Sequence, residues 1–209
     1  MKKNSNKFHK TEKKKSVILI GCGGHAKVCA DVILNSKKYK IAGLVCNDKK
    51  KSTPPIIGAD NDLKKLREKY KHVLIGIGQI KSSEKRAKLF RNLKKMNYVL
   101  PVIISEKTII SKSVKIKEGT IIMDGAIIRP DVEIGYNSII NTNAIVEHDV
   151  KIGNNTHIST GVIINGNVKI GNNVFIGSGS IIVNNIKIKS NSFIKAGTTV
   201  KKTIWKKLR

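Results

Sequence analysis

The sequence predicts a Rossmann-like small α/β domain followed by an all-β parallel solenoid of hexapeptide repeats. Three observations support this prediction. Residues 16–100 alternate short apolar strands with helical segments, which is typical of a small parallel α/β sheet. Residues 104–200 carry isoleucine or valine at every sixth position. Hydrophobic residues make up 40% of the 209 residues but aromatic residues only 4%, so the core must be aliphatic, which suits a thin, regular β architecture.

Periodicity and charge together divide the chain into four segments. We expect a disordered basic tail at 1–15, the α/β domain at 16–100, the solenoid at 101–202 and a basic C-terminal tail at 203–209. The formal net charge is +27. Residues 1–15 hold seven lysines and one glutamate, and residues 187–209 hold eight Lys/Arg and no acid, whereas residues 118–186 hold three basic and six acidic residues.

This charge distribution does not predict nucleic acid as a partner. A nucleic-acid groove concentrates positive charge on the folded body and interleaves it with stacking aromatic residues. Two alternatives remain open for the basic ends: they are solvated, or they make weak contact with a membrane surface or an anionic, nucleotide-bearing substrate.

The cysteine content and hydropathy predict a cytoplasmic protein. The three cysteines are odd in number, clustered early and without metal-ligand spacing, which indicates a reducing compartment. No apolar run approaches the ~20 residues of a membrane span, and the basic N-terminus precedes only a short apolar strand, so we expect no signal peptide.

The α/β domain begins with a strand, a glycine turn and a helix. The expected elements are strands at Val17–Ile20, Ile41–Cys46 and Val73–Ile77, and helices that end at about Leu34 and span Asp60–Tyr70 and Ser82–Met96. The turn Gly21-Cys22-Gly23-Gly24-His25-Ala26 fits a G-x-G-x-x-A phosphate fingerprint, with Asp48 downstream. About 85 residues supply only half of a dinucleotide fold, so a nucleotide-sugar site is favoured over NAD. A tight turn without a ligand remains the alternative.

The solenoid prediction rests on a strict repeat of six. From Ile104 to Val200, 17 consecutive positions spaced by six hold fifteen isoleucines and two valines. A helix of 3.6 residues per turn would scatter these side chains around its axis. Short strands that meet at Gly/Asn turns, with three strands to a triangular coil, would instead stack them in one inner column. The repeat therefore predicts just over five coils.

Together, the "IGxGGHAK" segment at Ile20–Lys27 and the hexapeptide ladder resemble the bacterial sugar acetyltransferases of the hexapeptide-repeat family. This family includes N-acetyltransferases of UDP-4-amino-sugars and O-acetyltransferases of sialic acid. The resemblance implies a left-handed β-helix and a homotrimer with acetyl-CoA bound between neighbouring solenoids. It also implies that a nucleotide sugar contacts Gly23, Gly24, His25, Asn47, Asp48 and Gly78. Asn47 departs from the family, where a second acid is common.

Two histidines stand out in the solenoid, His148 and His157. Because Val146 points inward in the ladder, Glu147, His148 and Asp149 are predicted to lie in an exposed turn. His157 precedes the inward Ile158 and is expected to face outward. Nine residues are half of an 18-residue coil, so the two histidines are predicted to lie on different faces. They would share a site only if a neighbouring subunit completed it.

The resemblance also implies a role for each residue of the site. His148 would be the general base, and Asp149 would raise its basicity. Because aspartate is shorter than the frequent glutamate, its hydrogen bond could be long or replaced by one from Glu147. His157 would contact the thioester carbonyl of acetyl-CoA. Three further residues fall where relatives contact the substrate or CoA: Gly166, Ser178 and Ala196.

These residues predict direct acetyl transfer from acetyl-CoA to a sugar. Histidine suits proton removal because its unperturbed pKa is about 6.5, and a carboxylate partner fixes its tautomer. No metal is expected, because only two histidines follow residue 100 and a three-histidine zinc site would lack a ligand. The resemblance favours the amine of a UDP-4-amino-sugar as the acetylated group; the sequence does not separate amine from hydroxyl, so O-acetylation of a sialic-acid-type sugar remains the alternative. A non-catalytic solenoid that binds or scaffolds other molecules, with two solvated surface histidines, remains the rival from another class.

Overall fold

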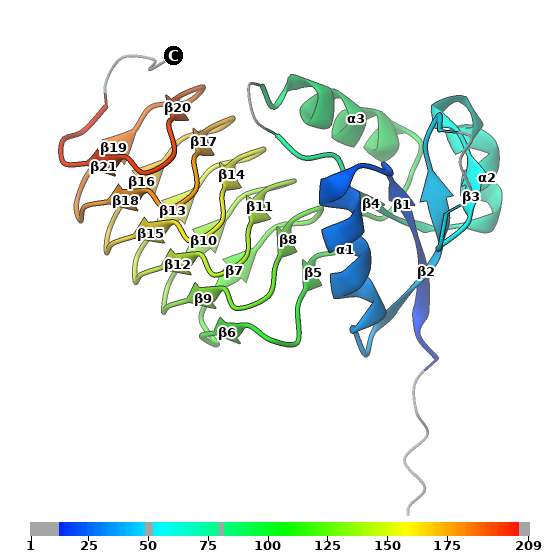
Figure 1. Ribbon diagram of the computed structural model, residues 1–209, viewed down its shortest axis with the longest axis horizontal. Coiled ribbons are helices and arrows are strands. Elements are labelled where there is room, and N and C mark those ends of the chain that lie inside the picture. Colours follow the sequence, from blue (N-terminus) through cyan, green and yellow to red (C-terminus); the bar gives the residue numbers. More distant parts are fainter. Residues whose placement is uncertain (1–12, 49–51, 80–81, 205–209) are drawn as a thin grey trace, which may run out of the picture.

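The computed structural model describes residues 13–48, 52–79 and 82–204. It contains a small α/β domain beside a three-sided solenoid (Figure 1). Most of the two predicted basic tails falls on residues 1–12 and 205–209, which lie outside the described residues. Lys15, placed in the N-terminal tail by the sequence, already belongs to the first strand.

In the part of the chain that the structure describes, the front domain is built on a four-stranded parallel sheet in the order β3-β2-β1-β4. Its strands are β1 (Lys15–Ile20), β2 (Tyr39–Val45), β3 (Ile56–Gly58) and β4 (His72–Ile75). Its helices are α1 (Gly24–Leu34), the 3-10 turn η1 (Asp60–Asp62), α2 (Leu63–Lys69) and α3 (Glu84–Lys95). The alternation of strands and helices matches the prediction, with strand ends shifted by up to two residues.

Two features of this domain differ from the prediction. The three-residue strand β3 was not predicted, because Ile56 and Ile57 are a very short apolar run directly after two prolines. The helix predicted from Asp60 begins as the 3-10 turn η1, in which the Asp62 carboxylate accepts a hydrogen bond from the backbone N–H of Ala59 at 2.8 Å. None of the helices described is long and apolar enough to cross a membrane.

Within the described residues, the solenoid contains seventeen two-residue strands, each of which ends on a ladder residue. The strands form three parallel sheets, one on each side. The β14 sheet holds β5 (Ile103–Ile104), β8 (Ile121–Ile122), β11 (Ile139–Ile140), β14 (His157–Ile158), β17 (Phe175–Ile176) and β20 (Phe193–Ile194). The β12 sheet holds β6 (Ile109–Ile110), β9 (Ile127–Ile128), β12 (Ile145–Val146), β15 (Ile163–Ile164), β18 (Ile181–Ile182) and β21 (Thr199–Val200). The β13 sheet holds β7 (Lys115–Ile116), β10 (Glu133–Ile134), β13 (Lys151–Ile152), β16 (Lys169–Ile170) and β19 (Lys187–Ile188).

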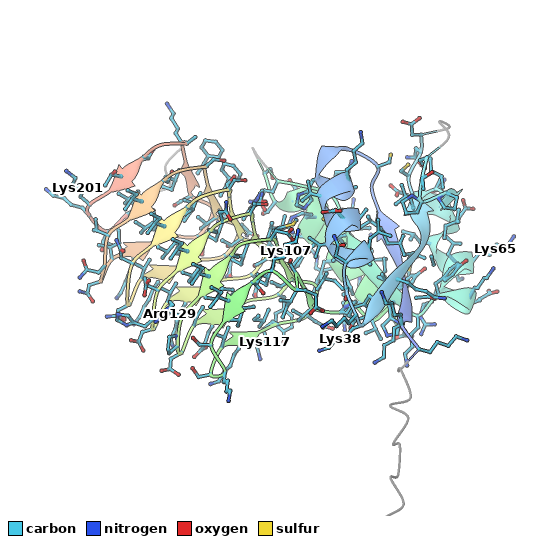
Figure 2. The ribbon with its side chains drawn as sticks, turned by 60° about the horizontal axis from the view of Figure 1, so that its bottom comes forward. Lys38, Lys65, Lys107, Lys117, Arg129 and Lys201 are labelled. Carbon is cyan, nitrogen blue, oxygen red and sulfur yellow. The ribbon has the colours of Figure 1, made fainter. Side chains whose placement is uncertain are left out.

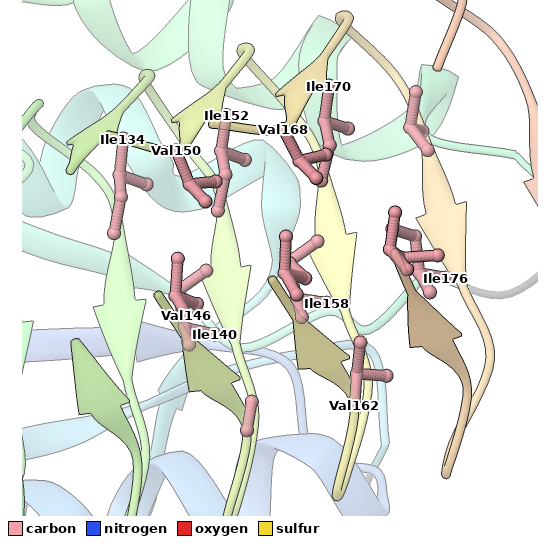
Figure 3. Packing of buried hydrophobic residues seen from close by; sticks show 14 of the residues in the cluster. Ile134, Ile140, Val146, Val150, Ile152, Ile158, Val162, Val168, Ile170 and Ile176 are labelled. Atoms are coloured by element: carbon pink, nitrogen blue, oxygen red, sulfur yellow. The ribbon is translucent and has the colours of Figure 1, made fainter. Parts of the chain in front are cut away.

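The ladder side chains fill the interior of the solenoid, as predicted (Figure 3). All ladder residues from Ile122 to Val200 are buried. Burying one such side chain stabilises the fold by about 2 kcal/mol. The first coil is the exception: Ile104 is 38% exposed, and Ile110 and Ile116 are half-buried. The first coil has no coil before it, whereas at the other end of the solenoid Ile204 packs against the core and pairs with Ile188.

The corners between strands have a fixed backbone conformation. The third residue after each ladder position has positive φ in every corner from Gly119 to Gly197, and it is always glycine, asparagine or aspartate. Glycine adopts this left-handed region freely, and asparagine and aspartate tolerate it better than other residues. The Gly/Asn turns predicted from the sequence are therefore confirmed, and Asp149, with φ 61°, occupies one of these positions.

The three outer faces of the solenoid differ in chemistry. On the β13 sheet the outward residues are charged: Lys115, Glu133, Lys151, Lys169 and Lys187. On the β12 sheet they form an isoleucine face: Ile109, Ile127, Ile145, Ile163 and Ile181. On the β14 sheet Ile103, Ile121 and Ile139 are buried against α1 and form the contact between the domains. Lysine and arginine side chains project outward from both domains (Figure 2).

Candidate functional site

His148 lies on an exposed corner between β12 and β13. Its Nδ1 atom lies 2.8 Å from Oδ2 of Asp149, and both side chains are more than half exposed. The shorter carboxylate therefore reaches the ring, and Glu147 does not replace it: among the described residues, the Glu147 side chain makes no hydrogen bond. Since the carboxylate accepts from Nδ1–H, the Nε2 atom of His148 is left with a lone pair that can take up a proton.

Gly166 lies one coil beyond His148, at the same corner. A Cβ atom on Gly166 would lie 2.7 Å from both Cε1 and Nε2 of His148, which is closer than carbon atoms in contact allow. The absence of a side chain at Gly166 therefore makes room for the imidazole ring. The structure brings these two predicted residues together.

His157 is buried, contrary to the expectation of an outward, solvent-exposed residue. It does point away from the solenoid interior, but the front domain covers it, so that only 6% of the residue is exposed. Its Nδ1 atom lies 2.9 Å from the carbonyl oxygen of Gln79. Burial, together with the nearby charges of Arg86 and His25, lowers the pKa of His157 to about 3, although the bond to Gln79 acts in the opposite direction. The ring is therefore neutral at neutral pH.

The two solenoid histidines lie on different faces, as predicted. His157 belongs to the β14 sheet, whereas His148 follows a strand of the β12 sheet. The structure instead brings His157 close to His25 of the front domain, with ring centroids 6.1 Å apart. Burial, followed by the charge of Arg86, lowers the pKa of His25 to about 4. Residue spacing does not predict this pair, because the two residues come from different domains.

The residues predicted to hold a nucleotide sugar gather at the carboxyl ends of the front-domain strands. Gly23 caps the N-terminus of α1, and Gly24 and His25 open the helix. Asn47 and Asp48 are exposed just after β2, and Gly78 packs against His25, where its Cβ atom would lie 3.3 Å from that of His25. Ligands of open parallel sheets bind at this edge.

A pocket of about 250 Å³ opens beside this edge. It is lined by Cys22, Ala26, Lys27, Ala30, Asp31, Leu34, Leu44, Ser52, Thr53 and Pro54. The pKa of Cys22 is raised to about 11, first by a hydrogen bond with Cys46 and by burial, then by the negative charge of Asp48. The Cys22 thiol, which lines the pocket, is therefore neutral, and Asp48 lies near it.

Ser178 and Ala196 lie together at another corner, between the β14 and β12 sheets. They are exposed and occupy equivalent positions in successive coils. The hydroxyl of Ser178 lies 2.9 Å from that of Ser159 in the preceding coil.

Among the described residues, no group of histidine, cysteine, aspartate and glutamate side chains could hold a metal ion.

A buried polar cluster between the domains was not predicted from the sequence. Arg86 on α3 is 2% exposed, and its Nη2 atom donates to the side chain of Gln79 at 3.3 Å. Desolvation lowers the pKa of Arg86 to about 10. Asn137 donates to Asn155 at 2.8 Å and to the backbone carbonyl of Arg86 at 3.4 Å. No local signal marks Arg86, since it stands among other basic residues of an amphipathic helix.

Comparisons with known proteins match both parts of the chain. Residues 16–93 match the PglD N-terminal domain, and residues 167–202 match the bacterial transferase hexapeptide model of six repeats. A search of curated proteins finds no match.

Solved structures match almost the whole chain. A histidine-to-asparagine mutant of perosamine N-acetyltransferase from Caulobacter crescentus, in complex with CoA and GDP-perosamine, is 30% identical, with a TM-score of 0.85 and 90% of each chain covered. The acetyltransferase domain of PglB from Neisseria gonorrhoeae, in complex with acetyl coenzyme A, is 26% identical, with a TM-score of 0.86 and 92% of this chain and 93% of that chain covered. WeeI from Acinetobacter baumannii, at 21% identity, a TM-score of 0.79 and coverage of 91% and 93%, shares the fold.

These matches confirm the predicted architecture of a small α/β domain followed by a left-handed parallel β-helix. The front-domain match, the hexapeptide match and the 30% identity over 90% of both chains agree with one another. The chain therefore belongs to the bacterial sugar acetyltransferases of the hexapeptide-repeat family.

Proposed function

We propose that the chain transfers the acetyl group of acetyl-CoA to the amine of a nucleotide-linked amino sugar of the UDP-4-amino-sugar type. The observation that carries this proposal is the His148–Asp149 pair, with 2.8 Å between Nδ1 and Oδ2, displayed on the corner of a hexapeptide solenoid. The solved relatives add support, since one is described with CoA and GDP-perosamine and another with acetyl coenzyme A.

The geometry of His148 suits direct transfer. The sugar amine attacks the thioester carbonyl, a C–N bond forms and the C–S bond breaks. The Nε2 atom of His148 takes the amine proton, while Asp149 holds Nδ1–H and stabilises the imidazolium that forms. The proton then passes to the CoA thiolate, so no covalent enzyme intermediate is needed.

The front domain is proposed to hold the nucleotide sugar at the edge that carries His25, Asp48 and Gly78. The open N-terminus of α1 favours a phosphate group, because its backbone N–H groups are directed outward and its first turn holds no acid. We propose UDP because the Gly-Gly-His turn resembles that of UDP-amino-sugar enzymes. Acetyl-CoA is proposed to lie along the solenoid near His157, Gly166, Ser178 and Ala196.

We also propose a homotrimer, which the isoleucine face supports. Ile109 and Ile181 are 60% and 38% exposed, and the three isoleucines between them are half-buried. A flat, regular row of apolar side chains of this kind is typical of an interface between subunits. The corner that carries His148 borders this face, so a neighbouring subunit would complete the site.

A cytoplasmic location is proposed from the three free cysteines and the use of acetyl-CoA.

A substrate panel tests the proposal. The full chain is incubated with acetyl-CoA and, in separate reactions, with a UDP-linked 4-amino-sugar, a GDP-linked 4-amino-sugar and free sialic acid. Mass spectrometry then detects the added acetyl group. We expect acetylation of the UDP-linked amine. Acetylation of only the GDP-linked sugar would correct the nucleotide, acetylation of only sialic acid would identify an O-acetyltransferase, and no acetylation of any amino sugar or hydroxyl would favour a binding or scaffolding role.

A further inference from the structure

Backbone groups fix the orientation of the Asn141 side chain. Asn141 opens the corner after β11, and its Oδ1 atom lies 2.8 Å from the backbone nitrogen of Thr142. A backbone N–H can only donate, so the atom facing it must be the amide oxygen. The amide nitrogen Nδ2 is therefore the atom that lies 3.2 Å from Nε2 of His157.

A second backbone group fixes the tautomer of His157. The Nδ1 atom lies 2.9 Å from the carbonyl oxygen of Gln79, and a carbonyl can only accept, so Nδ1 must carry the proton. The buried ring is neutral, as its pKa of about 3 indicates, so Nε2 carries a lone pair and accepts from Asn141. The chain of three hydrogen bonds thus runs in one direction, from the Thr142 N–H to the Gln79 carbonyl.

The direction of these hydrogen bonds determines which groups the His157 ring can still bind. Its single N–H is used by Gln79, and its lone pair is used by Asn141. The ring therefore has no proton to donate to a thioester carbonyl, which is the contact expected for His157 from the family resemblance. His157 is also buried, whereas Asn141 above it is half-exposed.

Asn141 has one N–H left for a ligand. Nδ2 carries two hydrogen atoms, and within the described part of the chain its only acceptor is His157. Asn141 opens a corner between the β14 and β12 sheets, and this row of corners also contains Ser178 and Ala196 two and three coils further along. The free N–H thus lies on the row of corners that holds two of the proposed acetyl-CoA contacts.

We infer that Asn141 is a residue of the acetyl-transfer site that donates its free amide N–H to the carbonyl oxygen of the acetyl donor, and that His157 is a positioning residue that orients this amide. The inference rests on the proposed acetyl transfer. A donor aimed at the carbonyl stabilises the negative charge that develops on its oxygen as the amine attacks. Gln79, which belongs to the loop after Gly78, ties this arrangement to the front domain.

The tautomer is tested without any substrate. Nitrogen-15 spectra of the full chain labelled at histidine are recorded at pH 7, and the His157 signals are assigned by their loss in His157→Gln. We expect a protonated Nδ1 and an unprotonated Nε2. A ring protonated at Nε2, or at both nitrogens, would overturn the inference. Because this experiment does not depend on activity, it gives a result even if no sugar is acetylated.

The role of Asn141 is tested with Asn141→Asp. Aspartate keeps an oxygen for the Thr142 N–H but removes the amide donor. If the wild type is active, we expect kcat to fall by about 100-fold or more, with KM for the sugar changed less than threefold. The His157 spectrum should change as well, since an ionised carboxylate has no proton to give to Nε2.

Asn191→Asp is the matched control. Asn191 is exposed at another corner, with positive φ, and its Oδ1 accepts from Asn173, a bond that aspartate can keep. It introduces the same charge, so we expect kcat within twofold of the wild type. A normal kcat in Asn141→Asp would sink the role proposed for Asn141. An inactive wild type would contradict the proposed function instead, and the spectra would still decide the tautomer.

Discussion

The Nδ1 atom of His148 lies 2.8 Å from Oδ2 of Asp149, the next residue in the chain. Asp149 occupies the left-handed position of its corner, with φ 61°. Every corner from Gly119 to Gly197 has glycine, asparagine or aspartate at this position. Aspartate is the one acid that this conformation favours. The backbone of the repeat thus explains why the partner of His148 is a short acid.

Removal of the imidazole should abolish most of the activity. We expect His148→Ala to lower kcat by between about 100- and 10,000-fold, because the proposed reaction loses its proton acceptor. Asn184→Ala is the control, since Asn184 is exposed two coils further along the same row of corners and should leave kcat within threefold. Steady-state kinetics with acetyl-CoA and the amino sugar measure both. A His148→Ala enzyme as active as the control would show that another group takes the proton.

The charge of Asp149 is tested with Asp149→Asn, which suits the left-handed backbone. We expect kcat to fall about tenfold or more, because the neutral amide no longer favours the imidazolium. Asp131→Asn is the matched control: Asp131 lies one coil earlier at the equivalent position, with φ 62°. Both variants remove one negative charge from the same row of corners. Equal activities for the two would indicate that Asp149 only shapes the turn.

A methyl group on Gly166 should displace the ring of His148. The added Cβ would lie 2.7 Å from Cε1 and Nε2. Because the His148 side chain is 61% exposed, the ring can turn away at little cost, so we expect Gly166→Ala to change the melting temperature by less than about 2 °C. We expect kcat to fall by up to about 100-fold, as misplaced catalytic groups do. Thermal unfolding and kinetics on the same sample separate the two effects, and an activity loss that merely followed a loss of folding would contradict this account.

The buried His157 should make the protein sensitive to acid. Its pKa is lowered from 6.5 to about 3 in the folded state, so the unfolded chain binds the proton first. Above about pH 6.5 the neutral ring costs no stability. As the pH falls from 6.5 toward 3, the free energy of unfolding decreases. Between pH 7 and pH 5 the free energy of unfolding should drop by about 2 kcal/mol per chain from this residue alone.

Denaturant unfolding at pH 7 and pH 5 checks this prediction. His157→Gln removes the titrating group, so the difference in unfolding free energy between the two pH values should shrink by about 2 kcal/mol. His25, which is present in both proteins, acts in the same direction, because its pKa is lowered to about 4. The comparison uses the change in unfolding free energy between the two pH values, so a general loss of stability in the variant does not affect it. An unchanged slope would mean that His157 titrates normally.

The repeat allowed the solenoid to be predicted almost completely. A spacing of six fixes which side chain of each strand points inward, so Val146 and Ile158 were placed correctly, and with them the exposed corner of His148. The burial of His157 was not predictable in this way. It depends on a hydrogen bond to Gln79, which lies 78 residues away in the chain. A repeat of six residues contains no information about contacts between domains.

The outer faces show the same limit. Ile121 and Ile163 are both isoleucines that directly precede a ladder residue. Ile121 is buried beneath the front domain, whereas Ile163 lies on the isoleucine face. Only the docking of α1 onto one of the three sides separates these two environments. Residue type and spacing identified both as outward positions but did not indicate what covers each.

The isoleucine face should hold the subunits together. Ile163 is the fourth of its five isoleucines and is half-buried in the single chain. We expect Ile163→Glu to dissociate the trimer, because association would place three carboxylates in an apolar interface, and burying an unpaired charge costs several kcal/mol. Light scattering coupled to size exclusion measures the mass. Lys169→Glu, on the charged face of the β13 sheet, is the control and should remain trimeric. We expect the dissociated Ile163→Glu protein to lose activity although His148 and Asp149 are intact, since in the proposed trimer a neighbouring subunit completes the site. A folded monomer with full activity would show that each chain carries a complete site of its own.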